Sequence, residues 1–240
     1  MTLSELEKEV PELADYTETM PAELRRLARV KVHPPGGLIH QKDSELRYLG
    51  IVAKGENRVI NEFENGKIYM IETNKAIDFI GEVALLANKP EASVTIEALT
   101  ANTIVYIPRK DAEKWVNSDT HILRKMAERT AFKLYRSSYN NGLKLYYPPM
   151  FLVADYLVRL YEQVFPESEN ISGKSKAPRP ITLQKTRERL GEELGMNTKT
   201  LDRTIRSMHK DGYFSLVKGK ITYGIEEYLR MKEYLSTAKG

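Results

Sequence analysis

The sequence predicts an α+β protein with three parts: an N-terminal β-roll of the jelly-roll type, a long helix, and a C-terminal winged helix-turn-helix. Short strand-like segments separated by turn residues fill positions 38–106, which is typical of a roll or barrel. A stripe of small and apolar side chains then recurs at helical spacing. Two amphipathic segments that meet at Gly195 follow, and a short hairpin comes after them. We therefore expect domains at 1–107, 108–140 and 141–240.

The composition narrows the class of protein. The chain has 240 residues, of which 41% are hydrophobic, enough for two domains with their own cores. No apolar run approaches the ~20 residues that span a bilayer, so we expect no membrane partner. The first residues are acidic and polar, unlike a secretory signal. Because there is no cysteine, disulfides, thiolate nucleophiles and cysteine-held iron–sulfur clusters are excluded, and we expect a cytoplasmic protein.

The net charge of +4 is unevenly distributed along the chain. Residues 1–138 carry 20 lysines and arginines against 21 acidic residues, whereas residues 139–240 carry 17 against 12. Within 174–220 the counts are 12 against 5. Positive charge concentrated around the helix-turn-helix is what binding a phosphate backbone requires.

The first hundred residues change from helical to strand-like texture at the turn Pro34-Pro35-Gly36-Gly37. Before it we expect helices over 1–20 and, opened by Pro21, over 22–30. After it, Asn65-Gly66 is a strong hairpin signal. The expected strands are 46–53, 56–63, 67–72, 92–99 and 103–108.

The long helix is predicted from Pro108 to about Asn140, with a break near residues 117–119 and a hinge at Asn140-Asn141-Gly142. Its stripe of small and apolar residues can pack on the chain's own roll or on the same helix of a second chain. We name as a candidate dimer interface Ile122, Met126, Ala127, Ala131 and Leu134.

The segment after the hinge carries the helix-turn-helix pattern. We expect a helix over 150–165, a loop over 166–180, and a strand at 181–183. Thr186 is a suitable N-cap for a helix that buries Leu190 and Leu194. Gly195 supplies a left-handed residue that ends this helix, and Asn197 caps the next one.

The second helix of this motif has a buried face, with Leu201, Ile205 and Met208, and a polar face that is largely basic. Strands at 213–217 and 220–223 follow, joined by Lys218-Gly219, and a last amphipathic helix covers 225–235. A small helical hairpin with a solvated basic face would also explain the two helices and the glycine between them. The hairpin at this distance favours the wing of a DNA-binding winged helix.

Several strings together resemble one family of bacterial regulators. They are Leu38-Ile39-His40-Gln41, Ile51-Val52-Ala53-Lys54-Gly55, Asn65-Gly66-Lys67, Phe79-Ile80-Gly81-Glu82, and the segment from Thr186 to Arg203. In this order they are similar to the cyclic-AMP receptor protein and fumarate–nitrate reductase regulator (CRP/FNR) family over roughly residues 30–225. A YeiL-like branch with a degenerate effector pocket is a further possibility. The resemblance implies a cyclic-nucleotide-binding-like roll and a homodimer that binds a palindrome in double-stranded DNA. It also implies RNA polymerase as a partner.

The resemblance also assigns roles to residues of the helix-turn-helix. Arg187 matches a phosphate-contacting position, while Thr198, Lys199 and Arg203 fall on the three base-reading positions. Arg203 could grip guanine through its fork of donors. Further phosphate contacts are expected from Thr200, Arg206, Lys218 and Lys220, although Arg206 could instead form only a surface ion pair.

The effector site departs from the family pattern. Gly81 and Glu82 match the start of the phosphate-binding segment of cyclic-nucleotide members. Ten residues on, Ala92-Ser93 stands where those members have Arg-Ser, so the guanidinium that clamps the phosphate is missing. Ser137 and Ser138 fall where the long helix touches the purine. We therefore expect a regulator that does not use cyclic AMP in the usual way, with an unknown effector. The alternative is a cyclic-nucleotide-responsive regulator with a modified phosphate pocket.

Other classes of function find less support in the sequence. A metal-dependent β-barrel enzyme would need clustered histidines and a carboxylate, but the four histidines, His33, His40, His121 and His209, are scattered. A cyclic-nucleotide-binding subunit that regulates a partner would not need the winged helix. We expect no enzyme activity, no metal site and no cofactor.

Overall fold

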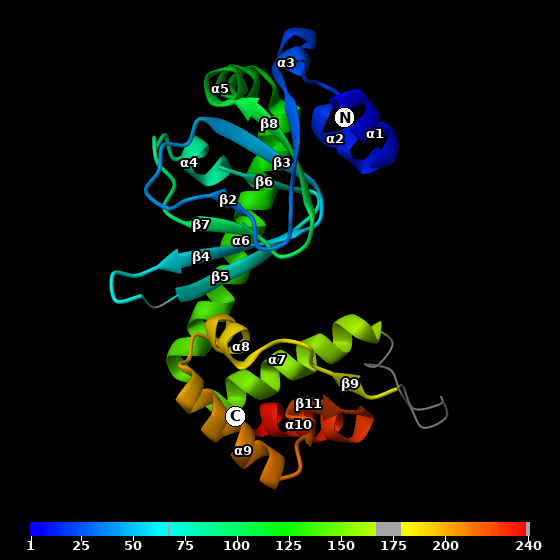
Figure 1. Ribbon diagram of the computed structural model, residues 1–240, viewed down its shortest axis with the longest axis vertical. Helices are drawn as coiled ribbons and strands as arrows, with labels where there is room; N and C mark the ends of the chain where they lie inside the picture. The colour runs from blue at the N-terminus through cyan, green and yellow to red at the C-terminus, as the bar shows by residue number, and fades with distance from the viewer. Residues whose placement is uncertain (67, 167–178, 239–240) are drawn as a thin grey trace. The chain divides into compact units, whose positions relative to one another are not determined.

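The computed structural model describes residues 1–66, 68–166 and 179–238, with the side chains of 139–141 left out. The chain divides into two compact units, Met1–Tyr139 and Asn140–Gly240. Figure 1 shows the first unit as a roll of strands with helices around it, and the second as a mainly helical unit. None of the described helices is long and apolar enough to cross a membrane.

Two antiparallel sheets build the roll in the first unit. Their strand orders are β1-β8-β3-β6 and β2-β7-β4-β5, so strands far apart in sequence become neighbours. The strands are β1 (Arg29–His33), β2 (Leu38–His40), β3 (Tyr48–Lys54), β4 (Glu56–Glu62), β5 (Ile68–Lys75), β6 (Asp78–Ile80), β7 (Thr95–Ala98) and β8 (Asn102–Pro108). This is the predicted mixed α and β class with an N-terminal roll.

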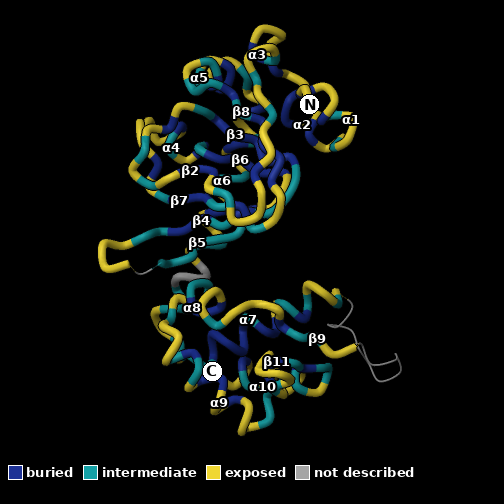
Figure 2. Tube along the Cα trace, viewed as in Figure 1, coloured by how far each residue is buried: buried dark blue, intermediate teal, exposed yellow. Residues whose placement is uncertain are grey.

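Side-chain alternation gives the central strands two buried faces. On β3, Val52 belongs to a small core between the sheets, whereas Leu49 and Ile51 belong to a second core with the helices. The helices are α1 (Leu3–Glu9), the 3-10 turn η1 (Pro11–Leu13), α2 (Ala14–Thr17), α3 (Ala22–Leu27), α4 (Glu82–Leu86) and α5 (Arg109–Ser118). Figure 2 shows buried residues along these strands and exposed ones in the connecting loops.

The N-terminal prediction was wrong at one point. The helix expected over 22–30 ends at Leu27, and Arg29–His33 forms β1 instead. This strand pairs with β8 from Arg29↔Tyr106 to His33↔Asn102. Because that partner lies more than sixty residues away, no local signal announced the strand.

The long helix differs from its prediction at its C-terminal end. The expected break is present, because α5 ends at Ser118 and α6 begins at Thr120. However, α6 (Thr120–Tyr146) continues through the predicted hinge at 140–142. Asn and Gly each weaken a helix by only about 1 kcal/mol or less. The obligatory stop is Pro148-Pro149, because proline lacks the amide donor that the helix needs.

The second unit places a three-stranded sheet beside five helical segments. Its elements are α7 (Pro149–Val164), β9 (Ile181–Thr182), α8 (Arg187–Leu194), α9 (Thr198–Lys210), β10 (Ser215–Val217), β11 (Lys220–Tyr223) and α10 (Ile225–Ala238), besides the end of α6. The strand order is β10-β11-β9. Tyr161 of α7 stacks on Tyr228 of α10 with ring centroids 4.5 Å apart, so α10 completes this core. The predicted loop over 166–180 lies almost wholly outside the described residues.

Candidate nucleic-acid interface and roll cavity

Both helices of the helix-turn-helix begin at the predicted caps. Thr186 has extended backbone, and its hydroxyl accepts a hydrogen bond from the Arg189 amide at the start of α8. Asn197 does the same for α9, with its side-chain oxygen 2.9 Å from the Thr200 amide. Each cap satisfies an amide that the first turn cannot pair, which fixes where the helix starts.

The turn between α8 and α9 depends on two glycines. Gly195 has φ 67°, the left-handed conformation predicted for it. Gly191 was not singled out from the sequence, but a Cβ on it would lie 2.7 Å from the Met196 carbonyl oxygen. The chain therefore passes so close to α8 that only glycine fits without a shift.

The two faces of α9 have opposite character. Leu201, Ile205 and Met208 are at most 2% exposed and pack against Leu190 and Leu194 of α8. The other face exposes a row of cations at helical spacing, Lys199, Arg203, Arg206 and Lys210. Among the described residues no ion pair engages any of these four side chains. The row is therefore a rigidly mounted positive surface.

The wing is a two-residue hairpin. Lys218 and Gly219 both have positive φ, 49° and 77°, as a type I′ turn requires. The register Val217↔Lys220 places this turn at the tip, with Lys218 and Lys220 exposed beside it. A second hairpin neighbour, β9, pairs with β11 through Thr222↔Thr182.

Two of the predicted DNA-contacting residues have partners within the chain. The Arg187 guanidinium donates to the Gly219 carbonyl at 2.9 Å and lies 3.5 Å from the Asp202 carboxylate. It thus joins the start of α8 to the wing and to α9. Lys220 donates to the Gln184 side chain. By contrast, Thr198 is exposed and Thr200 is half-buried on the first turn of α9.

A cavity of about 280 Å³ lies inside the first unit. The strands β4, β5, β6 and β7, the helix α4 and the side of α6 supply its lining. Most of that lining is apolar, with Leu46, Val59, Phe79, Ile80, Val83, Ala84, Ala87, Ala92, Val94 and Ile96. The polar lining residues are His40, Glu72, Asn74, Glu82, Lys89, Glu91, Ser93 and Lys133.

Lys133 of α6 enters this cavity and meets two acids of the roll. Its ammonium lies 2.8 Å from Glu82 Oε1, 3.1 Å from Asp78 Oδ1 and 3.1 Å from the Phe79 carbonyl oxygen. Burial opposes the charge on Lys133, but Glu82 and Asp78 outweigh it and raise its pKa. Burial raises the pKa of Glu82 and the nearby Asp78 adds to the effect, whereas the ammonium of Lys133 opposes it.

A second ion pair holds α6 to the roll one turn further along. Arg136 donates to Glu72 Oε2 at 2.6 Å and to the Thr73 carbonyl at 3.3 Å. The Glu72 side chain is 12% exposed. Side chains of α6 therefore occupy the wall of the cavity that faces the helix.

The structure brings together four of the six predicted effector residues. Gly81, Glu82, Ala92 and Ser93 line the cavity, and Gly81 has φ 86° where a Cβ would meet Leu46 at 2.8 Å. The other two, Ser137 and Ser138, do not line it. The lining residue that α6 contributes is Lys133.

The prediction missed Lys133, Asp78 and Asn74. Lys133 was detectable, because it continues the Ile122 and Met126 stripe at helical spacing. A charged residue in an apolar stripe is a candidate for a buried ion pair.

The predicted dimer interface divides into two faces of α6. Ile122 and Met126 are fully buried in the core of their own unit, so naming them as interface residues was wrong. Ala127, Ala131 and Leu134 are exposed, and Leu134 keeps 68% of its surface. The two faces lie next to each other on the helix, and the sequence stripe had merged them.

The histidines of the roll are buried among tyrosines. His33 Nε2 lies 2.7 Å from the Tyr106 hydroxyl, and His40 Nδ1 lies 2.9 Å from the Tyr48 hydroxyl. Burial lowers the pKa of both histidines. Burial also raises the pKa of Tyr48 to about 12. These histidines therefore belong to a hydrogen-bonded interior.

One group of possible metal ligands occurs among the described residues. Ligand atoms of Asp15, Glu18 and His121 lie within 4.8 Å of one another on the surface. Lys125 already forms an ion pair with Asp15, and His121 Nε2 lies 2.8 Å from the Asp15 carbonyl oxygen. These contacts join the N-terminal helices to α6.

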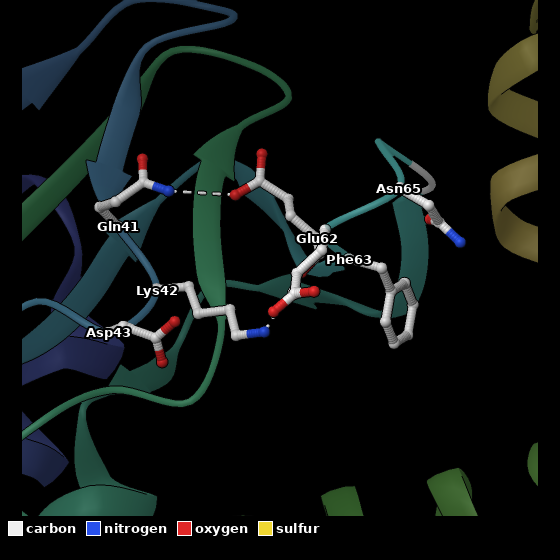
Figure 3. Close-up of a pocket in the computed structure, with 7 residues that line it drawn as sticks. Gln41, Lys42, Asp43, Glu62, Phe63 and Asn65 are labelled. Carbon is white, nitrogen blue, oxygen red and sulfur yellow. Dashed lines mark hydrogen bonds between the residues drawn. The ribbon is translucent and has the colours of Figure 1, made fainter.

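A second hollow opens on the surface between β2 and the β4–β5 hairpin (Figure 3). Several of its polar groups already have partners: Gln41 donates to Glu62 at 3.0 Å, and Lys42 donates to Asn61 at 2.9 Å. Glu62 also accepts from Thr95 at 2.8 Å. These bonds fix the hairpin to the loop after β2.

Comparison with known proteins finds similar sequences. A model of the cyclic nucleotide-binding domain matches residues 30–119. The cAMP-activated global transcriptional regulators CRP of Salmonella typhimurium and of Escherichia coli O157:H7 are each 25% identical over 189 residues, which is 78% of this chain and 85% of theirs. The chain is therefore similar to regulators of the CRP type over most of its length. By their names, these relatives are transcriptional regulators.

Several solved structures share the fold. The c-di-GMP responsive regulator CLP of Xanthomonas campestris superimposes with a TM-score of 0.68 at 13% identity, covering 85% of this chain and 97% of that one. A CooA mutant from Carboxydothermus hydrogenoformans gives 0.68 at 15%, covering 94% and 95%. A CRP/FNR-family regulator from Thermus thermophilus gives 0.66 at 19%, covering 85% and 98%.

Proposed function

We propose that this chain is a transcriptional regulator of the CRP/FNR type that binds a specific sequence of double-stranded DNA through α9 and the wing. The observation that carries the proposal is the exposed row of cations on α9, which no ion pair within the described chain neutralises. A helix fixed by its Asn197 cap and by a buried face can enter the major groove as a rigid body. The excess of basic residues in 174–220 supplies the attraction to phosphate.

The residues of this surface divide into readers and anchors. Thr198, Lys199 and Arg203 read base edges, and Arg203 makes the bidentate contact with guanine. Thr200, Arg206, Lys218 and Lys220 contact phosphates. Arg187 acts as a positioning residue, because its guanidinium already holds Gly219 of the wing.

The active form is a homodimer bound to a palindromic site. Two copies pair through the exposed side of α6 that carries Ala127, Ala131 and Leu134. A two-fold dimer presents two copies of α9 to two half-sites about one helical turn apart. RNA polymerase is the partner through which such a bound dimer would act on transcription.

Cyclic AMP is not the effector in the usual way. The relatives are cAMP-activated by name, but here Ala92 stands at the position of the phosphate-clamping arginine. Lys133 cannot replace it, because Glu82 and Asp78 already hold its ammonium. The alternative, a cyclic nucleotide bound in a modified pocket, is supported by the match of 30–119 to the cyclic nucleotide-binding domain.

The test is selection of binding sites from a random duplex library, with and without cyclic AMP, at two salt concentrations. We expect an enriched inverted repeat without the nucleotide. Arg203→Ala should relax specificity at one base of each half-site and cost about 1–3 kcal/mol. Arg206→Ala should weaken all sequences alike and reduce the salt dependence.

Arg47→Ala serves as the matched control, because Arg47 is an exposed arginine of the roll. It should change neither the selected sequence nor the affinity. Binding that is uniform across sequences and vanishes with salt would contradict the proposal. Enrichment only with cyclic AMP would favour the alternative.

A further inference from the structure

Acids outnumber cations around the roll cavity once Asp78, which lies behind the lining against Lys133, is counted. Lys133 is the single ammonium shared by the carboxylates of Asp78 and Glu82. The pair Glu72 and Arg136 is balanced. Of the other described charged residues in the lining, Lys89 and Glu91 are exposed and of opposite sign. One buried carboxylate is therefore left without a cation of its own.

The cavity also contains an acceptor without a donor. Asn74 is 2% exposed, and its Oδ1 has no hydrogen-bond partner among the described residues. Asn74 and Glu72 lie two residues apart on β5, so they share a face of the strand, and both line the cavity. An unpaired buried acceptor is unfavourable, because its hydration is lost without a replacement.

The remaining wall suits an apolar body. Phe79, Ile80, Val59, Val94 and Ile96 line the cavity from the strands. At about 280 Å³ the space is at the small end of ligand pockets, which run from roughly 300 Å³ upward. An anionic ligand would find the excess carboxylate and the unpaired acceptor here, and both repel it.

We propose that the roll cavity binds a small organic cation, a protonated amine on an apolar body. The positive charge offsets the carboxylate that Lys133 leaves unbalanced, and an N–H group donates to Asn74 Oδ1. The amine and Lys133 compete for the Glu82 carboxylate, which lines the cavity, and Asp78 can keep Lys133 when the amine binds. Because Lys133 comes from α6, occupancy of the cavity is coupled to how firmly α6 is held to the roll.

The raised pKa of Glu82 agrees with this assignment. Its ionised form lacks a full counter-charge, and a bound cation supplies one. Asp78 is the other acid beside Lys133, and Glu72 faces the same space but is neutralised by Arg136. The imidazole of His40 also lines the cavity, and burial lowers its pKa, which disfavours a positive charge there.

Titration calorimetry of the full chain with matched probes tests the proposal. The probes are phenethylamine, phenethyl alcohol and hydrocinnamate, which share an aromatic body and differ in charge, together with cyclic AMP. We expect the amine to bind at least about tenfold more tightly than the carboxylate, with the alcohol between them.

Three variants locate the binding. Glu82→Gln should remove the preference for the amine over the alcohol, because only the charge is lost. Asn74→Leu should weaken the amine and the alcohol alike. Glu64→Gln, in the exposed β4–β5 turn, is the control and should change nothing. Fluorescence of Trp115, the one tryptophan of the chain, reports whether each variant folds.

Three results would overturn the inference. They are hydrocinnamate or cyclic AMP binding as tightly as the amine, amine binding that both cavity variants leave unchanged, and no heat from the amine at millimolar concentration. Only the effect of amine binding on regulation rests on the proposed function, whereas the cavity assignment does not. DNA site selection uses the second unit. A parent chain that selects its DNA site but does not bind the amine would therefore refute the cavity assignment alone.

Discussion

The ammonium of Lys133 lies 2.8 Å from Glu82 Oε1, with only 11% and 4% of the two side chains exposed. Lys133 is on α6 and Glu82 begins α4, so this pair joins the long helix to the roll at the cavity. Breaking a buried pair is costly because the remaining charge stays in a poorly solvated site. The pair is therefore a structural link as well as part of the cavity.

Replacing Lys133 with methionine should destabilise the first unit by about 3–5 kcal/mol, because two buried carboxylates would lose the ammonium that they share. Urea unfolding followed by Trp115 fluorescence measures this, since Trp115 is 2% exposed within that unit. Lys125→Met on the same helix is the control. Its pair with Asp15 is more exposed, at 26% and 52% of the two side chains, so its loss should be much smaller. Equal losses would mean that Lys133 is not an effective buried cation.

The buried histidines should make the first unit less stable in mild acid. Burial lowers the pKa of His33 and His40 below 6.5, and the neighbouring Lys31 adds to this for His33. Below about pH 6.5 these histidines bind protons more readily in the unfolded chain than in the folded chain. The free energy of unfolding therefore decreases as the pH falls through about 6.5. Glu82 acts oppositely, because its raised pKa favours the folded state as the pH falls.

The measurement is the urea midpoint from Trp115 fluorescence between pH 8 and pH 5.5. A His33→Gln, His40→Gln variant should lose less stability across this range than the parent chain. Glu82→Gln in the same series removes the opposing effect of Glu82. The urea midpoint of this variant should therefore fall more steeply with decreasing pH than that of the parent chain. An unchanged slope in the double histidine variant would show that these two imidazoles do not set it.

The helix-turn-helix was predictable in detail because its signals are local. Thr186 and Asn197 cap helices through their own side chains, and Gly195 ends one through its own φ angle. A positive φ at Lys218 and Gly219 is likewise set within a two-residue turn. Each signal needs only neighbours within a few positions, and the sequence displays these directly.

The roll and the cavity were less predictable because their determinants lie far apart in sequence. β1 forms a strand because it pairs with the distant β8. Lys133 forms ion pairs with Asp78 and Glu82, which lie more than fifty positions earlier in the chain. The stripe on α6 gave the right spacing but not which face meets the roll. Periodicity identifies residues that share a face, whereas only packing decides what covers it.

Two helical glycines should respond oppositely to alanine. In α8, Gly191→Ala places a Cβ 2.7 Å from the Met196 carbonyl oxygen, which belongs to backbone and cannot rotate away. We expect a loss of about 1–3 kcal/mol from this crowding. In α6, Gly142 has nothing within 4 Å of an added Cβ, so Gly142→Ala should stabilise by about 0.5–1 kcal/mol.

Scanning calorimetry of both alanine variants can separate the two effects. Gly191→Ala should lower the transition temperature of the second unit and weaken DNA binding, because the turn that orients α9 must open. Gly142→Ala should raise that temperature. If both substitutions raise it, the turn before α9 has enough room for a methyl group, and the close approach of Met196 is not a constraint.

The exposed side of α6 should separate dimerisation from protomer stability. Leu134 keeps 68% of its surface within the chain, whereas Met126 keeps none. Leu134→Ala should therefore leave urea unfolding of the protomer nearly unchanged. It should weaken self-association, because in the dimer this side chain packs against the partner subunit. Met126→Ala should cost the first unit about 2–5 kcal/mol by opening a cavity, with much less effect on association.

Sedimentation equilibrium over a concentration series, paired with Trp115 fluorescence at one fixed concentration, measures both quantities. A parent chain that stays monomeric at micromolar concentration would refute the interface, and stronger loss of association from Met126→Ala than from Leu134→Ala would place it on another face.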